Sequence, residues 1–244
     1  MKTEPRPANK ILSALPHEEF ERLRPKLHDA QIKIGEIIYQ PEEPIDFVYF
    51  INRGIVSWLA TLEDGNTVEA GVIGLEGLAG ISVLLGARST PNLALVQGEI
   101  DASKISSQDL ISEFRRNGEL NRLILRFMHS LFTQVAQTAA CNRLHTLDQR
   151  LARWLLMMHD RINGDEFTLT QEFLSRMLGV RRAGVSVAAN DLRQSGLIDY
   201  HRGNINILNR RGLEAESCEC YQIVKKEYNG ASKITRASLI PELK

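Results

Sequence analysis

The chain has 244 residues, of which 43% are hydrophobic and 25% charged, and its formal net charge is zero. These values are typical of an ordinary globular protein with one large domain or two smaller ones. The charge is unevenly distributed: residues 1–138 carry 14 basic and 18 acidic side chains, whereas residues 139–213 carry 11 and 7. A basic C-terminal segment beside an acidic N-terminal one is typical of a DNA-binding module joined to a regulatory module.

Several classes of protein are excluded by simple features of the sequence. The longest apolar runs are only a few residues, far shorter than a membrane span. The N-terminal segment MKTEPRPANK lacks the apolar stretch of a secretory signal. Cys141, Cys218 and Cys220 are too few and too oddly placed for a disulfide framework. We therefore expect a protein of the reducing cytoplasm with no membrane partner.

The first part of the chain predicts a helix followed by a small roll of antiparallel strands. Residues 8–28 carry apolar side chains at a ragged helical spacing. Short β-rich runs such as IIYQ, FVYFI and IVSWLA then alternate with turn signals until about residue 105. Strands this short and regular indicate a barrel or roll. Within it, the segment GVIGLEGLAG (71–80) has a glycine at every third position, a pattern that invites comparison with a phosphate-binding loop.

A long helix is predicted over residues 119–142, and a second one over residues 146–162. The first carries a seam with alternating spacings of three and four: Ile124, Phe127, Leu131, Gln134, Thr138 and Cys141. Such a seam packs either on its own domain, which is the commoner use, or on a second copy of the chain. A length of about six turns without glycine or proline favours the second copy.

The strongest functional signal lies in residues 167–208. Thr170 is a suitable N-cap for a helix whose first turn holds Gln171. Gly179 ends that helix, and a short turn leads into a second helix that ends in the glycine cap Ser195-Gly196-Leu197. Two helices joined by a tight glycine-containing turn are the helix-turn-helix pattern. The two short strands that follow, LIDYHRGNINIL, add a wing.

The outer face of the second helix is rich in hydrogen-bond donors: Arg182, Ser186, Asn190 and Arg193. Arginine can bind guanine with two hydrogen bonds, and asparagine or serine can read adenine or phosphate. The alternative is an ordinary helical hairpin with solvated charges, which the ordered succession of cap, helix, turn, helix, cap and wing disfavours. The sequence contains no GxSxG, HExxH or GxxxxGK[ST] motif. We therefore expect a protein that is not an enzyme and binds double-stranded DNA.

Five features follow one another along the chain: the roll with FINRGIV, the cassette GLEGLAGISVLLG, the long helix, RLARWLL and the winged module. Together they resemble the Crp/Fnr family of bacterial transcription regulators. The resemblance covers about residues 8–213 and implies an α+β protein. Its parts would be an antiparallel, jelly-roll-like sensor domain (1–118), a dimerisation helix (119–143), a winged helix-turn-helix domain (144–228) and a polar extension (229–244). It also implies a homodimer on a palindromic operator, RNA polymerase as a further partner, and a small-molecule effector of unidentified chemistry.

Residue roles can be carried over from the family by position. Arg182 matches an arginine that reads guanine, and Thr170 matches a position that contacts the DNA backbone. The next family position is usually acidic, whereas here it is Ala183, and a further family arginine falls on Val187. The DNA sequence that this chain recognises must therefore differ from the one recognised by the best-known members of the family. The expected base readers are Arg181, Arg182 and Ser186, and the expected phosphate contacts are Gln171, Arg193 and Arg202.

Binding of cyclic AMP is not expected from the same comparison. Cyclic-nucleotide-binding members use a Gly-Glu pair, a later Arg-Ser pair and a Thr-Ser pair on the long helix. The corresponding positions are Gly80-Ile81, the displaced pair Arg88-Ser89, and Val135-Ala136. A buried phosphate needs a cation and a ribose hydroxyl needs an acceptor, so these departures remove the required chemistry. A different small anion, held by Arg88 and backbone amides, is the alternative. The expected effector-pocket residues are then Gly80, Ile81, Arg88, Ser89 and Val135.

No cofactor and no metal ligand are expected. The iron–sulfur sensors of the family use N-terminal cysteines, and this chain has none before Cys141. His129 on the long helix has the phase of a surface or packing histidine rather than of a haem ligand. A lone Cys218-Glu219-Cys220 without nearby histidines is a weak metal motif, so ordinary thiols are expected. A signalling module whose roll binds an unidentified effector, and a redox sensor acting through the cysteines, are the alternative functions.

Overall fold

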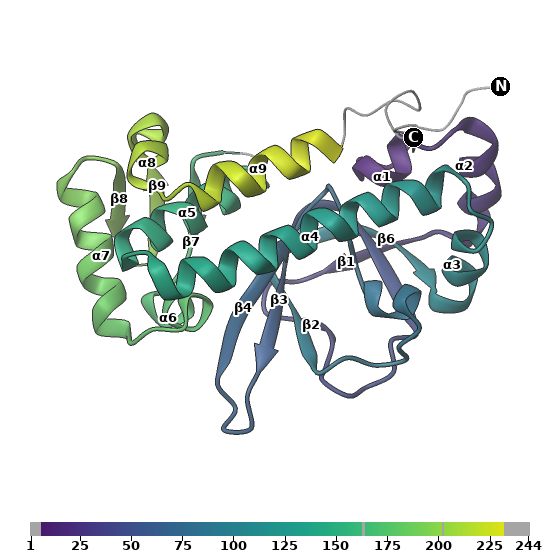
Figure 1. Cartoon of the computed structure of the whole chain (residues 1–244), viewed down its shortest axis with the longest axis horizontal. Coiled ribbons are helices and arrows are strands. Elements are labelled where there is room, and N and C mark those ends of the chain that lie inside the picture. Colours follow the sequence, from purple (N-terminus) through teal and green to yellow (C-terminus); the bar gives the residue numbers. More distant parts are fainter. Residues whose placement is uncertain (1–5, 163, 202, 232–244) are drawn as a thin grey trace, which may run out of the picture.

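The computed structural model describes residues 6–162, 164–201 and 203–231. Figure 1 shows an N-terminal roll of strands and a C-terminal domain made mostly of helices, with the long helix α4 (Glu119–Leu144) running between them. The predicted α+β class, with an antiparallel sheet followed by a helix-turn-helix, is confirmed. Among the described residues, no helix is both long and apolar enough to cross a bilayer.

The roll is built around its longest strands. Its elements in chain order are α1 (Lys10–Ser13), α2 (His17–Leu23), η1 (Arg24–Lys26), β1 (His28–Ile32), β2 (Ile37–Tyr39), β3 (Phe47–Thr61), β4 (Thr67–Ile73), β5 (Leu78–Ala79), η2 (Ile81–Leu85), β6 (Asn92–Ser106) and α3 (Ser107–Phe114). The strand order is β1-β6-β3-β4, with β2 paired to β6 and β5 paired to β3. The single helix predicted over residues 8–28 is instead divided, because Pro16 cannot continue the hydrogen-bond ladder of α1.

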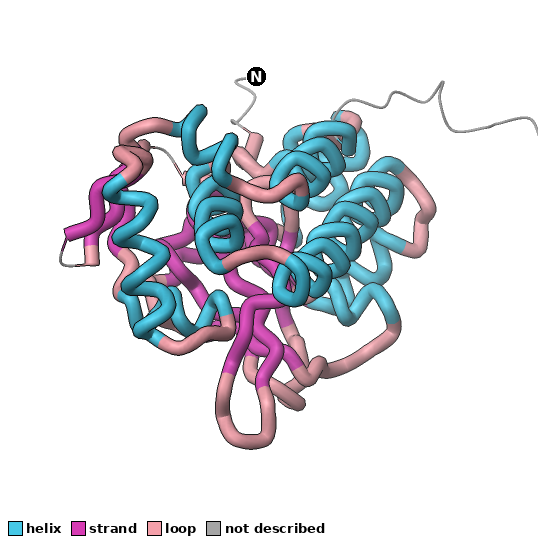
Figure 2. The backbone as a smooth tube through the Cα atoms, turned by 60° about the vertical axis from the view of Figure 1, so that its left-hand side comes forward, coloured by secondary structure: helices cyan, strands magenta, loops and turns pink. Residues whose placement is uncertain are grey.

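The C-terminal domain combines a three-stranded sheet with five helices of the described chain. Its elements are α5 (Leu147–His159), β7 (Glu166–Thr168), α6 (Gln171–Leu178), α7 (Arg182–Gln194), β8 (Ile198–His201), β9 (Asn204–Ile207), α8 (Arg210–Glu216) and α9 (Cys220–Ala231). The sheet order is β7-β9-β8, and β8 with β9 forms the wing. Figure 2 shows the hairpin between β3 and β4 protruding from the roll beside this domain. Residues 232–244, most of the predicted extension, lie outside the described residues.

The apolar seam of α4 faces the chain's own roll. Ile124, Phe127 and Leu131 are at most 3% exposed and belong to the core of the roll. Gln134 and Cys141, at the weaker end of the seam, are also buried. The expectation that this seam pairs two copies of the chain is therefore wrong, and packing on its own domain is the correct alternative.

The spaced glycines explain how α4 can lie so close to the roll. A Cβ atom at Gly71 would overlap the amide of Gln134, and one at Gly77 would overlap the ring of Phe127. Gly80 has φ 101°, in the left-handed region that favours glycine. The spacing of three thus serves close helix packing and one unusual backbone conformation.

Candidate DNA-binding site

The helix-turn-helix is built from α6 and α7, and local capping fixes both. The hydroxyl of Thr170 accepts a hydrogen bond from the backbone N–H of Phe173 at 3.1 Å, which caps α6. Gly179 ends α6 with φ 62°. Val185 and Leu192 on the inner face of α7 are buried in the core of the C-terminal domain. The opposite face of α7 is therefore turned outward.

The outer face of α7 brings most of the predicted DNA-binding residues together. Arg181 is the N-cap of α7 and Arg182 its first residue, and both side chains are exposed. The hydroxyl of Ser186 donates to Oε1 of Gln171 at 2.7 Å, which ties α7 to the start of α6. One turn further on, Arg193 donates to Oδ1 of Asn190 at 3.2 Å. Arg202, expected in the wing, lies outside the described residues.

One further residue on this face was missed as a candidate contact. Val187 has 61% of its surface exposed, on a helix whose other large apolar side chains are buried. Its position out of phase with Val185, Ala189 and Leu192 was the available signal. An exposed methyl-bearing side chain between polar ones can contact the methyl group of thymine.

A buried carboxylate connects the roll to the DNA-binding domain. Glu69 of β4 is 6% exposed, and the indole N–H of Trp154 in α5 donates to its Oε1 at 2.8 Å. Its Oε2 accepts from the hydroxyl of Ser57 at 2.6 Å and from the amide of Gln97 at 2.9 Å. Burial raises the pKa of Glu69 to about 7, against the opposing effect of the hydrogen bonds from Ser57 and Trp154. No local motif marks Glu69 in the sequence.

The raised pKa of Glu69 predicts a specific pH dependence of stability. Between its ordinary pKa of 4.5 and about 7, the unfolded chain loses this proton while the folded protein keeps it. The Glu69 contribution to the free energy of unfolding should thus fall by about 3 kcal/mol as the pH rises through this range, and then level off. Denaturant titrations of wild type and Glu69→Gln from pH 4.5 to 8 measure it, because the glutamine variant lacks this contribution.

The exposed Glu63 offers a matched control for this measurement. Glu63→Gln should follow the wild-type pH profile, since Glu63 lies on the protruding hairpin. A stability difference between wild type and Glu69→Gln that does not change with pH would contradict the prediction.

A second buried contact joins the glycine segment to the same domain. Nε of Arg161, just after α5, lies 2.8 Å from Oε1 of Glu76, and the two side chains are only 7% and 11% exposed. The same carboxylate oxygen accepts from the backbone N–H of Gly74 at 3.1 Å. The guanidinium of Arg161 also stacks over the ring of Tyr228 in α9, at 5.2 Å from its centre. The acidic residue of GLEG therefore pairs with the DNA-binding domain.

The predicted effector-pocket residues differ in their exposure to solvent. Ile81 is 6% exposed and packs into the core of the roll, next to Gly80. Arg88 is exposed, whereas Ser89 and Val135 are half-buried. A cavity of about 1140 Å³ lies elsewhere, between the β3–β4 hairpin and α6. A smaller cavity of about 160 Å³ borders Glu76 and Arg161, and none of the five predicted residues lines either one.

Comparison with known proteins agrees with this architecture. Residues 149–216 match the family model described as the Crp-like helix-turn-helix domain. The chain is 22% identical over 183 residues to the global nitrogen regulator of a Nostoc species, covering 71% of this chain and 82% of that protein. It is 23% identical over 196 residues to the global nitrogen regulator of Synechococcus elongatus, covering 76% and 88%.

Solved structures show the same fold. FixK2 from Bradyrhizobium japonicum superposes with a TM-score of 0.68 at 18% identity, covering 79% of this chain and 98% of that one. TTHB099 from Thermus thermophilus, a transcriptional regulator of the CRP family, superposes with a TM-score of 0.63 at 21% identity, covering 77% and 96%.

The helix-turn-helix with its outward donor-rich face defines a DNA-binding transcription regulator. The matching helix-turn-helix domain, the structural neighbours and the curated relatives support a Crp/Fnr family regulator. The relatives named above are regulators rather than enzymes.

Proposed function

We propose that this protein is a homodimeric regulator that reads a palindromic operator with α7 and does not respond to cyclic AMP. The outer face of α7 is the observation that carries the proposal. A recognition helix places its N-terminal residues against base edges in the major groove. Arg181 and Arg182 occupy that end of α7 and are exposed.

The remaining residues of this face divide into base contacts and positioning contacts. Ser186 and Val187 follow Arg182 by one turn, where a hydroxyl and an apolar side chain can read a base edge and a thymine methyl group. Gln171 and Arg193 lie at the margins of the face, where contacts to phosphate fix the orientation of the protein. The hydroxyl of Thr170 already caps α6, so we assign the contact at this position to the start of α6 as a whole.

A second copy of the chain would pack on the face of α4 that points away from the roll. The exposed residues there follow spacings of four and three: Leu125, His129, Phe132, Ala136, Ala139 and Arg143. Leu125 and Phe132 are 50% and 55% exposed, which is unusual for large apolar side chains on one helix face. This heptad pattern supports a parallel pair of α4 helices, in which residues 1–118 form the sensor domain and residues 144–228 bind one half-site each.

Selection of duplexes from a random pool tests the proposed function. The full chain should enrich an inverted repeat whose half-sites are separated by about one or two helical turns, because a two-fold dimer mirrors a palindrome. Enrichment of no sequence at all, or of an isolated half-site, would contradict the proposal.

The absence of cyclic AMP binding is tested by calorimetry. Titration of cyclic AMP into the full chain should give no binding heat, because Ile81 places an apolar, buried side chain where the ribose needs an acceptor. Val135 and Ala136 likewise offer no hydroxyl on α4. A micromolar dissociation constant would overturn this part of the proposal.

A further inference from the structure

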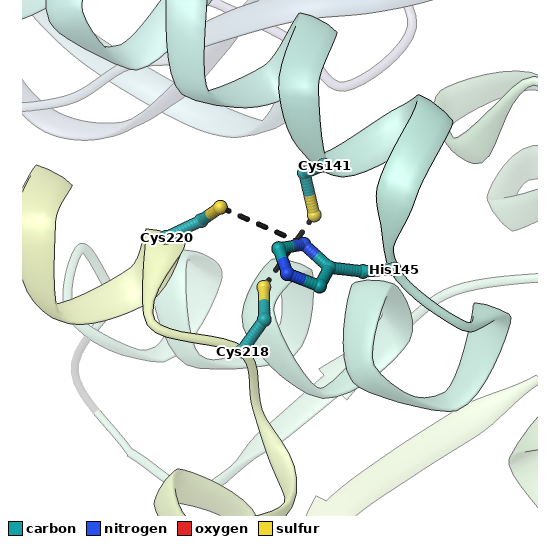
Figure 3. Close-up of side chains that lie close together, drawn as sticks. All are labelled: Cys141, His145, Cys218 and Cys220. Carbon is teal, nitrogen blue, oxygen red and sulfur yellow. Dashed lines mark hydrogen bonds between the residues drawn. The ribbon is translucent and has the colours of Figure 1, made fainter.

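Three cysteines and one histidine meet where α4 ends and α9 begins. Figure 3 shows Cys141, His145, Cys218 and Cys220 pointing toward one another. One potential ligand atom from each lies within 4.8 Å of all the others. The sulfurs of Cys141 and Cys218 are 3.5 Å apart, and the sulfur of Cys220 is 3.7 Å from Nδ1 of His145. The three cysteines are at most 4% exposed.

These separations fit one tetrahedral ion. Thiolate and imidazole ligands at about 2.3 and 2.0 Å from a single zinc ion lie roughly 3.5–3.8 Å from each other. The 3.5 and 3.7 Å separations lie in this range, and all four ligand atoms lie within 4.8 Å of one another. An iron–sulfur cluster binds its thiolates on different iron atoms and so spreads them farther apart. A disulfide would bring two of the sulfurs to about 2.05 Å.

The histidine ring is oriented by a carboxylate from the same segment. While Nδ1 of His145 faces Cys220, its Nε2 lies 3.3 Å from Oε2 of Glu219. A carboxylate beside one ring nitrogen holds the proton there and leaves the lone pair of the other nitrogen free for a metal. Glu219 stands between Cys218 and Cys220 in the sequence, so a single turn supplies both sulfur ligands and the group that orients the histidine.

The electrostatic surroundings also fit an anionic site. Arg153 of α5 is 4% exposed, and its guanidinium donates to the hydroxyl of Thr138. Its Nε has no hydrogen-bond partner among the described residues. One Zn²⁺ with three thiolates has a net charge of −1, which would compensate this buried cation.

We propose that Cys141, His145, Cys218 and Cys220 bind one Zn²⁺ ion and that Glu219 is a positioning residue for His145. On binding, the three thiols release their protons to solvent and the sulfurs become thiolate ligands. Soft thiolates favour zinc over magnesium or calcium. Four protein ligands fill the tetrahedron, which is the closed arrangement of a structural rather than a catalytic zinc site.

The position of the ion gives it a defined structural effect. His145 lies between α4 and α5, and Cys218 lies between α8 and α9. The ion therefore connects two segments. One is the link between α4 and α5, where the DNA-binding domain begins, and the other is the turn that precedes α9. Its removal should increase amide hydrogen exchange in residues 141–147 and 217–222 while the roll stays protected.

Metal analysis of the full chain, purified under reducing conditions with any tag removed, tests the site. Elemental mass spectrometry should find about one zinc per chain. After chelation, titration with Co²⁺ should give the visible absorption bands of tetrahedral cobalt with thiolate ligands. Zinc affinity, measured by competition with a chromophoric chelator, should fall about 10- to 100-fold in Glu219→Gln and further in Cys218→Ser or His145→Ala.

His28→Ala is the matched control, because His28 is an exposed histidine at the start of β1 and belongs to neither the cysteine cluster nor the proposed dimer face. This variant should keep the zinc content and the cobalt spectrum of the wild type. Should a ligand variant fail to fold, the wild-type cobalt spectrum and the Glu219→Gln affinity still decide the matter. A folded, reduced wild type that contains no zinc and gives no cobalt spectrum would overturn the proposal. Peptide mapping that finds a Cys141–Cys218 disulfide under these reducing conditions would also overturn it. Neither result depends on DNA binding.

Discussion

Replacing Arg182 with alanine is expected to weaken binding to the selected operator roughly 10- to 100-fold, as loss of a two-hydrogen-bond contact to guanine costs about 1–3 kcal/mol. Arg182 is exposed at the first position of α7, so the substitution should leave the fold intact. Fluorescence anisotropy with operators changed one base pair at a time measures both the loss and its position. The variant should lose its preference at one base pair of each half-site.

Arg115→Ala is a matched control, because it removes the same charge from an exposed arginine at the end of α3. Figure 1 places α3 and α7 at opposite ends of the molecule, so this variant should bind as the wild type does. If Arg182→Ala kept both the affinity and the base preference of the wild type, α7 would not be the reading helix.

Introducing a carboxylate at the exposed seam of α4 should have the largest effect of all. Phe132→Asp replaces an apolar side chain that is 55% exposed at the middle of the seam. In a parallel two-fold pair this position meets its own copy, so two like charges would replace an apolar contact. We expect a monomer in light-scattering measurements. Affinity for the full operator should fall by about 100-fold or more, since the two half-sites are no longer bound together.

Ile34→Asp provides the comparison, because Ile34 is 61% exposed and belongs to the turn between β1 and β2 rather than to α4. This variant should remain dimeric and bind the operator normally. A dimeric Phe132→Asp protein with full operator affinity would show that the chains associate through another surface.

The helix-turn-helix could be predicted from sequence because its signals are local. Thr170, Gly179 and the Ser195-Gly196-Leu197 cap each fix one end of a helix within a few residues. The strands of the roll could likewise be predicted from short β-rich runs between turn residues. These features depend on the conformational preferences of residues that are only a few positions apart, so the amino-acid sequence is enough to predict them.

The direction in which α4 faces could not be predicted in the same way. Two stripes on this helix follow spacings of three and four, one through Ile124 and Phe127 and the other through Leu125 and Phe132. Periodicity identifies both stripes but does not say which one meets the roll. The glycines at positions 71 and 77 contained that information, since they leave room for Gln134 and Phe127, but only the fold reveals these pairs.

The Cys141, His145, Cys218 and Cys220 cluster was missed for a related reason. Cys141 and Cys218 are 77 residues apart in the chain, and each half alone is a weak motif. The expectation that Cys218 and Cys220 have no histidine nearby was wrong, because the end of α4 brings His145 to within 3.7 Å of Cys220. Long-range packing, rather than local spacing, assembles this group.

The links from Glu69 to Trp154 and from Glu76 to Arg161 set an energetic threshold for any signal that reorients α7. Breaking a buried ion pair such as Glu76 and Arg161 costs about 3–5 kcal/mol when one charge stays buried without its partner. A molecule that moves the DNA-binding domain away from the roll while either charge stays buried must therefore prefer the released arrangement by roughly 100- to 5,000-fold in affinity. A ligand that prefers the released arrangement by only tenfold in affinity would bind the protein without changing the position of α7.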